Sequence, residues 1–112
     1  MNKLIIEFIG AFFLVLTIGC TGIPSAPGVI PPLAIGAALM VMVYAGGHIS
    51  GGHYNPAVTL AVFIRGRCSA KDAIAYIITQ LMAGIVAALV VGFLVGWGKP
   101  LKITGVPQAF LA

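Results

Sequence analysis

Apolar residues fill this chain in long runs, and polar residues gather where the runs end. No side chain over residues 8–64 carries a formal charge. About 20 apolar helical residues cross a hydrocarbon core of about 30 Å, and the runs at 4–22 and 70–97 are long enough to do so. The run at 33–47 is somewhat short and reaches spanning length only with residues 29–32 included. The pattern predicts three membrane-spanning helices.

Proline and glycine mark the predicted breaks between these runs. Four prolines predict a loop after the first run: Pro24, Pro27, Pro31 and Pro32. Two glycine pairs bracket a predicted break after the second run: Gly46–Gly47 and Gly51–Gly52. The last run begins with Ser69 followed three residues later by Asp72, which is typical of a helix start with a reciprocal cap.

A fourth apolar run, at residues 56–65, decides the expected architecture. At about 1.5 Å per residue, about 11 helical residues cover about 16 Å, roughly half of the hydrocarbon core. It is apolar on every side, so it is not a helix of the membrane surface. We expect a re-entrant half-helix that enters and leaves on one side and is ended by Gly66.

Composition agrees with an integral membrane protein that crosses the bilayer several times, and we expect it in the plasma or inner membrane. The 112 residues are 61% hydrophobic and 7% charged, whereas a soluble domain carries about a quarter charged residues. The net charge of +4 is too small and too dispersed for nucleic-acid binding. The basic residues lie at segment ends: Lys3, Arg65, Arg67, Lys71, Lys99 and Lys102.

Catalytic and metal chemistry find no support in the sequence. Cys20 and Cys68 lack a CxxC spacing, and His48 and His53 lack further ligands of a suitable type. No nucleophile–base pair or phosphate loop is present, so we expect no enzyme, metal or cofactor. Glu7 is the exception among the polar residues, because a carboxylate within a membrane helix is a functional candidate.

The Asn55-Pro56-Ala57 step predicts a helix start of a particular kind. Pro56 suits the first helical position and Asn55 the N-cap, which leaves the Asn55 amide NH₂ free to donate. The helix N-terminus adds roughly half a positive charge that opposes cations. An extended segment before it can present backbone carbonyls as acceptors: Gly51, Gly52, His53 and Tyr54. Donors beside acceptors suit a neutral hydroxylic solute.

Residues 48–59, His-Ile-Ser-Gly-Gly-His-Tyr-Asn-Pro-Ala-Val-Thr, resemble the first signature loop of the aquaporin and glycerol-facilitator (major intrinsic protein) family. The segment from Glu7-Phe8 to Phe12-Phe13 resembles that family's first helix. Tyr76, Gln80 and Gly84 resemble its third. The resemblance covers about residues 3–98. It implies an all-α membrane fold of three spanning helices and one re-entrant half-helix, which is one of the family's two inverted repeats.

The resemblance also implies roles for individual residues. Glu7 would be a buried brace behind the re-entrant loop, and we expect His48 and Gln80 to contribute structural hydrogen bonds. The selectivity-filter positions correspond to Ile35, Gly52 and Val58. Because the family's filter arginine is absent there, we expect a wider opening for water, glycerol or other small neutral solutes.

One repeat cannot enclose a pore. Residues 1–98 form the expected half-repeat, and 99–112 resemble the start of the missing second one. Two inverted copies would bring their Asn55 residues together at mid-membrane, with four such pores grouped as in the family. Four basic residues on one side against two on the other permit both orientations. Three alternatives remain open: a separately encoded second half, a non-conducting remnant, and a proton-coupled small transporter using Glu7.

Small residues recur at every fourth position of the last run: Gly84, Ala88, Gly92 and Gly96. Such a ladder permits close approach of membrane helices. We interpret it as packing within the chain rather than as a dedicated dimer face.

Overall fold

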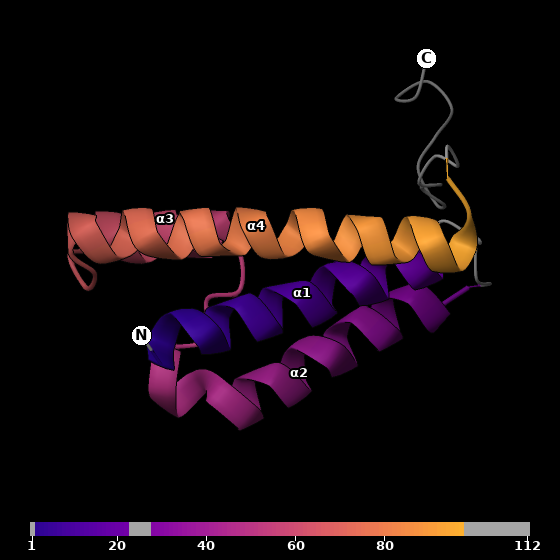
Figure 1. The fold of residues 1–112 in the computed structure, drawn as a ribbon. Coiled ribbons are helices and arrows are strands. Elements are labelled where there is room, and N and C mark those ends of the chain that lie inside the picture. The colour runs from indigo at the N-terminus through magenta and orange to yellow at the C-terminus, as the bar shows by residue number, and fades with distance from the viewer. Residues whose placement is uncertain (1, 23–27, 98–112) are drawn as a thin grey trace, which may run out of the picture.

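The computed structural model describes residues 2–22 and 28–97. Within them the chain forms four helices and no strand: α1 Asn2–Gly22, α2 Ile30–Ser50, α3 Pro56–Ile64 and α4 Ala70–Val95 (Figure 1). Helices α1, α2 and α4 are each long and apolar enough to cross a membrane. The predicted all-α architecture with three spanning helices is therefore confirmed. The predicted tail at 99–112 lies outside the described residues, as do Pro24 and Pro27.

The predicted loop at Pro31 and Pro32 is wrong, and the break after α2 begins later than predicted. Pro31 and Pro32 occupy the first turn of the helix, not a loop, because backbone N–H groups there have no helical partner to lose. The helix also continues through Gly46 and Gly47. A Cβ at Gly46 would collide with Ile6 of α1, so this glycine serves close packing and not chain reversal. The break at Gly51–Gly52 is confirmed, since α2 ends at Ser50.

Helix α3 has nine residues, so it is about 14 Å long and covers half of a hydrocarbon core. Arg65 ends it, and Gly66 follows with a left-handed φ of 78°. The N–H of Gly66 donates to Phe63 O at 2.9 Å and that of Arg67 to Val62 O at 3.1 Å, which is a Schellman ending. Ser69 then caps α4, accepting the N–H of Asp72 at 3.2 Å as predicted.

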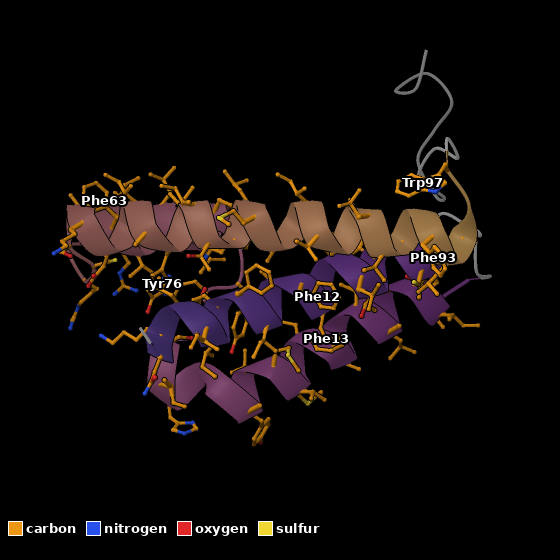
Figure 2. All side chains as sticks on the ribbon, viewed as in Figure 1. Phe12, Phe13, Phe63, Tyr76, Phe93 and Trp97 are labelled. Atoms are coloured by element: carbon orange, nitrogen blue, oxygen red, sulfur yellow. The ribbon has the colours of Figure 1, made fainter. Side chains whose placement is uncertain are left out.

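The helices pack in a simple order. α1 lies between α2 and α4, and α3 packs against α4 (Figure 1). One face of α4 is buried against the rest of the chain: Ala73, Tyr76, Gln80, Ala83, Ala87 and Val91. Figure 2 shows Tyr76 on the side of α4 that faces α1, whereas Phe63 and Trp97 lie on the remote side.

The predicted small-residue ladder is not this packed face. Gly84 has no neighbour within 4 Å of a built Cβ, and Ala88 is exposed. The buried row lies one residue earlier, at Ala83 and Ala87, so the expectation of packing within the chain does not hold for Gly84 and Ala88. Gly92 is buried under the Trp97 ring.

Candidate functional site

The loop between α2 and α3 reverses the chain through three left-handed residues. Gly51 (φ 91°) and Gly52 (φ 67°) adopt this conformation without a Cβ penalty. Tyr54 (φ 57°) adopts it despite its side chain, at a cost of about 1–2 kcal/mol. A non-glycine residue holds such a conformation only where surrounding contacts overdetermine it. Those contacts come from α1, α2 and α4.

Glu7 of α1 is the centre of these contacts. Its side chain is 0% exposed. Oε2 accepts from Ser50 Oγ at 2.7 Å and from the His53 N–H at 3.1 Å. Oε1 accepts from the Tyr54 N–H at 2.7 Å and from Gln80 Nε2 at 2.8 Å. A carboxylate is tolerated away from water only when its oxygens are satisfied in this way, and these four bonds tie the loop to both α1 and α4.

Thr59 extends the network into α3. The side chain is fully buried, and its Oγ1 accepts from Gln80 Nε2 at 3.0 Å. His53 Nδ1 lies 2.9 Å from the same oxygen. Tyr76 completes the set by donating its hydroxyl to the Ser50 carbonyl at 2.7 Å, at the end of α2.

Sequence reasoning missed Ser50 and Thr59 as parts of the site. The available signal was their polarity: Thr59 is the one polar residue within the apolar sequence of α3, and a buried hydroxyl at membrane depth requires a partner. The sequence did not show which residue would be the hydrogen-bond partner of this hydroxyl.

The ring of Tyr54 locks the loop from the other side. It is 3% exposed, and its hydroxyl donates to Met42 O of α2 at 2.7 Å. A Cβ at Gly10 of α1 would overlap the ring, and one at Gly46 would lie 2.9 Å from the hydroxyl. The residue preceding Asn55 is thus held between two helices that approach closely because each has a glycine there.

This packing predicts a sharp effect of Gly10→Ala. The added methyl has no space beside Tyr54, so we expect the free energy of unfolding to fall by about 1–3 kcal/mol, the usual cost of overpacking. Thermal unfolding in detergent measures it. Gly36→Ala on α2 is the control, because a Cβ there meets nothing within 4 Å, and it should be neutral or stabilising. Equal stability of both variants would contradict this account of the ring.

Asn55 stands at the exposed tip of α3. Its Oδ1 accepts the Ala57 N–H at 2.8 Å, with Pro56 at the first helical position. The capping bond uses the oxygen of the amide and leaves the NH₂ for an outside partner. The predicted capping geometry is therefore present.

A groove of about 420 Å³ runs beside this tip, between α1 and α4. Asn55 and Pro56 line it, as do Gly84 and Ala88, the two residues that were expected to pack within the chain. Gln80 also lines it. The Gln80 side chain is 3% exposed, and its Oε1 is buried without a hydrogen-bond partner among the described residues.

Comparison with known proteins shows the family of this chain. The chain matches the Major intrinsic protein (MIP) family over residues 1–108. It belongs to that family. The three spanning helices and this membership make it a multi-pass membrane protein.

Relatives within the family carry channel names. The chain is 47% identical over 93 residues to Glycerol uptake facilitator protein-like 6 of Lactiplantibacillus plantarum, covering 81% of this chain and 43% of the relative. It is 43% identical over 98 residues to Aquaporin Z of Photorhabdus laumondii, covering 80% and 42%. It is 41% identical over 105 residues to Aquaporin NIP1-1 of Arabidopsis thaliana, covering 86% and 34%. The chain thus spans less than half the length of these curated relatives.

The positions expected to line a family pore are distributed over several elements. Ile35 lies half-buried in α2, Gly52 in the loop, and Val58 in α3 with 42% of its surface exposed. None of the hydrogen bonds among the described residues ends on the carbonyls of Gly51–Tyr54.

His48 does not join the family loop network that we expected it to support. Its side chain is exposed near the end of α2, while Glu7 and Gln80 are at the centre of that network. The helical repeat is the reason: Ser50, two residues later, occupies the inward face that contacts Glu7.

Proposed function

We propose that this chain is one half of a membrane channel for water and small neutral solutes such as glycerol. The observation that carries the proposal is the tip of α3, where Asn55 caps the helix with its oxygen and leaves its NH₂ exposed. Glu7 ties the loop before this nine-residue helix, and Thr59 within the helix bonds to Gln80, so the position of the tip is fixed by both α1 and α4.

Selection at this tip is electrostatic. The free N–H groups at the start of α3 add roughly half a positive charge. The oxygens of Glu7 already accept four hydrogen bonds, and Asp72 lies in the first turn of α4. Cations are opposed, while a solute with lone pairs accepts from Asn55 and donates to the carbonyls of Gly51–Tyr54. Two of the relatives are named aquaporins and one a glycerol uptake facilitator, which agrees with this solute class.

Completion of the pore requires a second half, which we propose is an inverted second copy of the chain. Two observations support this. The groove beside Asn55 is lined by small residues, Gly84 and Ala88, that permit close approach. Gln80 Oε1 is buried there with no donor among residues 2–22 and 28–97, and such an acceptor is costly unless a partner supplies a donor.

A separately encoded second half is the second candidate, and the same groove favours it. A proton-coupled transporter using Glu7 is less well supported. Both carboxylate oxygens already accept from donors of this chain, so Glu7 is a structural tie and not an open site for a transported proton.

Osmotic shrinkage of proteoliposomes tests the proposal. Vesicles containing the purified chain should shrink severalfold faster than empty vesicles of the same lipid in stopped-flow light scattering. We expect Gly84→Leu, which fills the groove, to abolish both the flux and the dimer seen by chemical crosslinking. Gly36→Leu, a matched change in open space on α2, should retain both.

Two outcomes would contradict the proposal. Flux equal to that of empty vesicles would exclude a homomeric channel and leave the second-half alternative. Labelling of Lys3 from one face only in sealed vesicles would exclude an inverted pair, because antiparallel copies expose this residue on both faces.

A further inference from the structure

His53 is bound through both its main chain and its ring, and the ring bond spans the tip of α3. Its N–H donates to Glu7 Oε2 at 3.1 Å, and its ring Nδ1 lies 2.9 Å from Thr59 Oγ1. Asn55 and Pro56 lie between His53 and Thr59 in the chain. The ring bond therefore closes the end of the loop onto the start of α3, with Asn55 inside the closed segment.

The direction of this hydrogen bond follows from the other partners of Thr59. Both oxygens of Glu7 accept backbone N–H groups, so the part of the Gln80 amide that meets Oε1 is its NH₂. The same NH₂ lies 3.0 Å from Thr59 Oγ1. Because an amide NH₂ can only donate, Thr59 accepts there, and its own hydroxyl proton needs another acceptor. Thr59 is 0% exposed, so leaving that proton unpaired would be costly.

The acceptor for this proton is the ring of His53. In α1 the hydroxyls of Thr17 and Thr21 donate to the carbonyl four residues earlier. Within residues 2–22 and 28–97 the Thr59 hydroxyl makes no such bond, and its remaining partner is His53 Nδ1. A ring nitrogen that accepts a hydrogen bond carries no proton, so the neutral ring has its proton on Nε2.

The other ring nitrogen is free to carry that proton. Nε2 lies beside Gly51, where a built Cβ would be 3.3 Å away, and it bonds to none of the described residues. Gln80 Oε1 is the one buried side-chain polar atom without a partner in the described part of the chain. Nε2 therefore reaches the surface, where water can accept its proton.

Two further contacts make the ring bond a support for Asn55. The N–H of Thr59 donates to the Asn55 carbonyl at 3.1 Å, so a shift of Thr59 moves Asn55 as well. The ring of Tyr76 lies against the imidazole, with the ring centroids 5.0 Å apart, and limits its rotation. His53 thus acts on the capping amide through Thr59.

We propose that His53 is a positioning residue for Asn55, held as the neutral imidazole with its proton on Nε2 and accepting the Thr59 hydroxyl at Nδ1. The inference rests on the proposed function for the use that a fixed Asn55 amide has. The protonation of the ring and the rigidity of the tip are properties of the chain itself. Both can be measured whether or not a solute passes.

Nitrogen-15 NMR of histidine-labelled protein in lipid bilayers tests the assignment of the ring proton. At mildly alkaline pH, protonated and unprotonated ring nitrogens have well-separated shifts. We expect His53 to show an unprotonated Nδ1 and a protonated Nε2 in one fixed form. His48 is exposed and is the chain's other histidine, so it should show an average of the two tautomers, and His48→Gln identifies its signals. Thr59→Val removes the donor and should move the His53 signals toward the same average.

Hydrogen exchange at the cap tests the positioning role. The Ala57 N–H donates to Asn55 Oδ1, so its exchange rate reports how firmly the tip is held. His53→Gln moves the side-chain amide beyond the Nδ1 position, and we expect exchange at Ala57 to rise about fivefold or more. His53→Asn places an amide oxygen at the Nδ1 position and should keep the native rate. The Asp72 N–H, capped by Ser69, is the control and should be unchanged in both variants.

Three results would overturn the proposal. A native His53 ring protonated at Nδ1 would reverse the direction of the bond. Unchanged exchange at Ala57 in His53→Gln would show that the bond does not hold the tip. Equal loosening by His53→Asn and His53→Gln would show that the bulk of the ring matters and not its acceptor. The ring assignment needs only the native chain, so it decides the matter even if a variant fails to fold. Absent solute flux, with the expected NMR and exchange results, would count against the proposed channel alone.

Discussion

Glu7→Leu is expected to cause the largest loss of stability of any single substitution in this chain. The change leaves four donors without their acceptor in a buried site: Ser50 Oγ, the His53 and Tyr54 N–H groups, and Gln80 Nε2. Each orphaned buried donor costs about 1–3 kcal/mol. Allowing for rearrangement of the loop, we expect the free energy of unfolding to fall by about 3–5 kcal/mol, with loss of solute flux.

A graded series identifies the cause. Glu7→Gln keeps one acceptor oxygen and should lose roughly half as much stability as Glu7→Leu. Thr17→Val is the control on the same helix, because the Thr17 hydroxyl is exposed and bonds only to Phe13 O of its own helix. Such surface changes usually stay within about 0.5 kcal/mol. Unfolding by heat or by sodium dodecyl sulfate in mixed micelles measures all three, and a Glu7→Leu protein as stable as the native chain would refute this role.

Asn55→Asp is expected to change which solutes and ions pass the candidate pore without destabilising the fold. Aspartate is as good an N-cap as asparagine, so the bond to the Ala57 N–H is retained and thermal stability should change by less than about 1 kcal/mol. The substitution places a full negative charge where roughly half a positive charge opposes cations. Across about 4 Å such a charge is worth about 1 kcal/mol in water and about 4 at an effective dielectric constant of 20.

We therefore expect cation conductance of Asn55→Asp to rise by a factor of about ten or more over the native background. Conductance across planar bilayers and sodium entry into dye-loaded vesicles measure it, while osmotic water flux provides the comparison. Asn55→Ser caps the helix without a charge, so its cation conductance should stay at the native background. If the aspartate variant were equally tight while still passing water, the tip of α3 would not face the permeation path.

Some residues of the site could be predicted from the sequence, and others could not. Asn55 and Ser69 cap their helices through bonds to residues two and three positions away, so local spacing was enough to predict them. Thr59, Ser50 and Tyr76 act through partners that are distant along the chain, and their pairing depends on how α1, α2 and α4 meet. The sequence around each of these residues does not show how the helices pack together.

The same distinction applies to the glycines. Gly51 and Gly66 end helices by adopting left-handed backbone angles, which residue type alone suggests. Gly46 and Gly10 look identical in sequence but lie inside helices, where they admit the Tyr54 ring and a neighbouring helix. Gly84 belongs to neither group, because it lines the open groove beside Asn55. For Gly84 the packing register of α4 decides the outcome, because the buried row of α4 lies one residue away from the predicted ladder.

By itself, the sequence determined that this chain is an all-α membrane protein with three spanning helices and one helix too short to span. Apolar run length against membrane thickness decides that question, and it needs no tertiary information. Tertiary structure decided how the short helix is supported, because a buried carboxylate must collect its donors from wherever the fold brings them. It also decided which small residues are packed and which are left facing outward, since that choice depends on the rotation of each helix about its own axis.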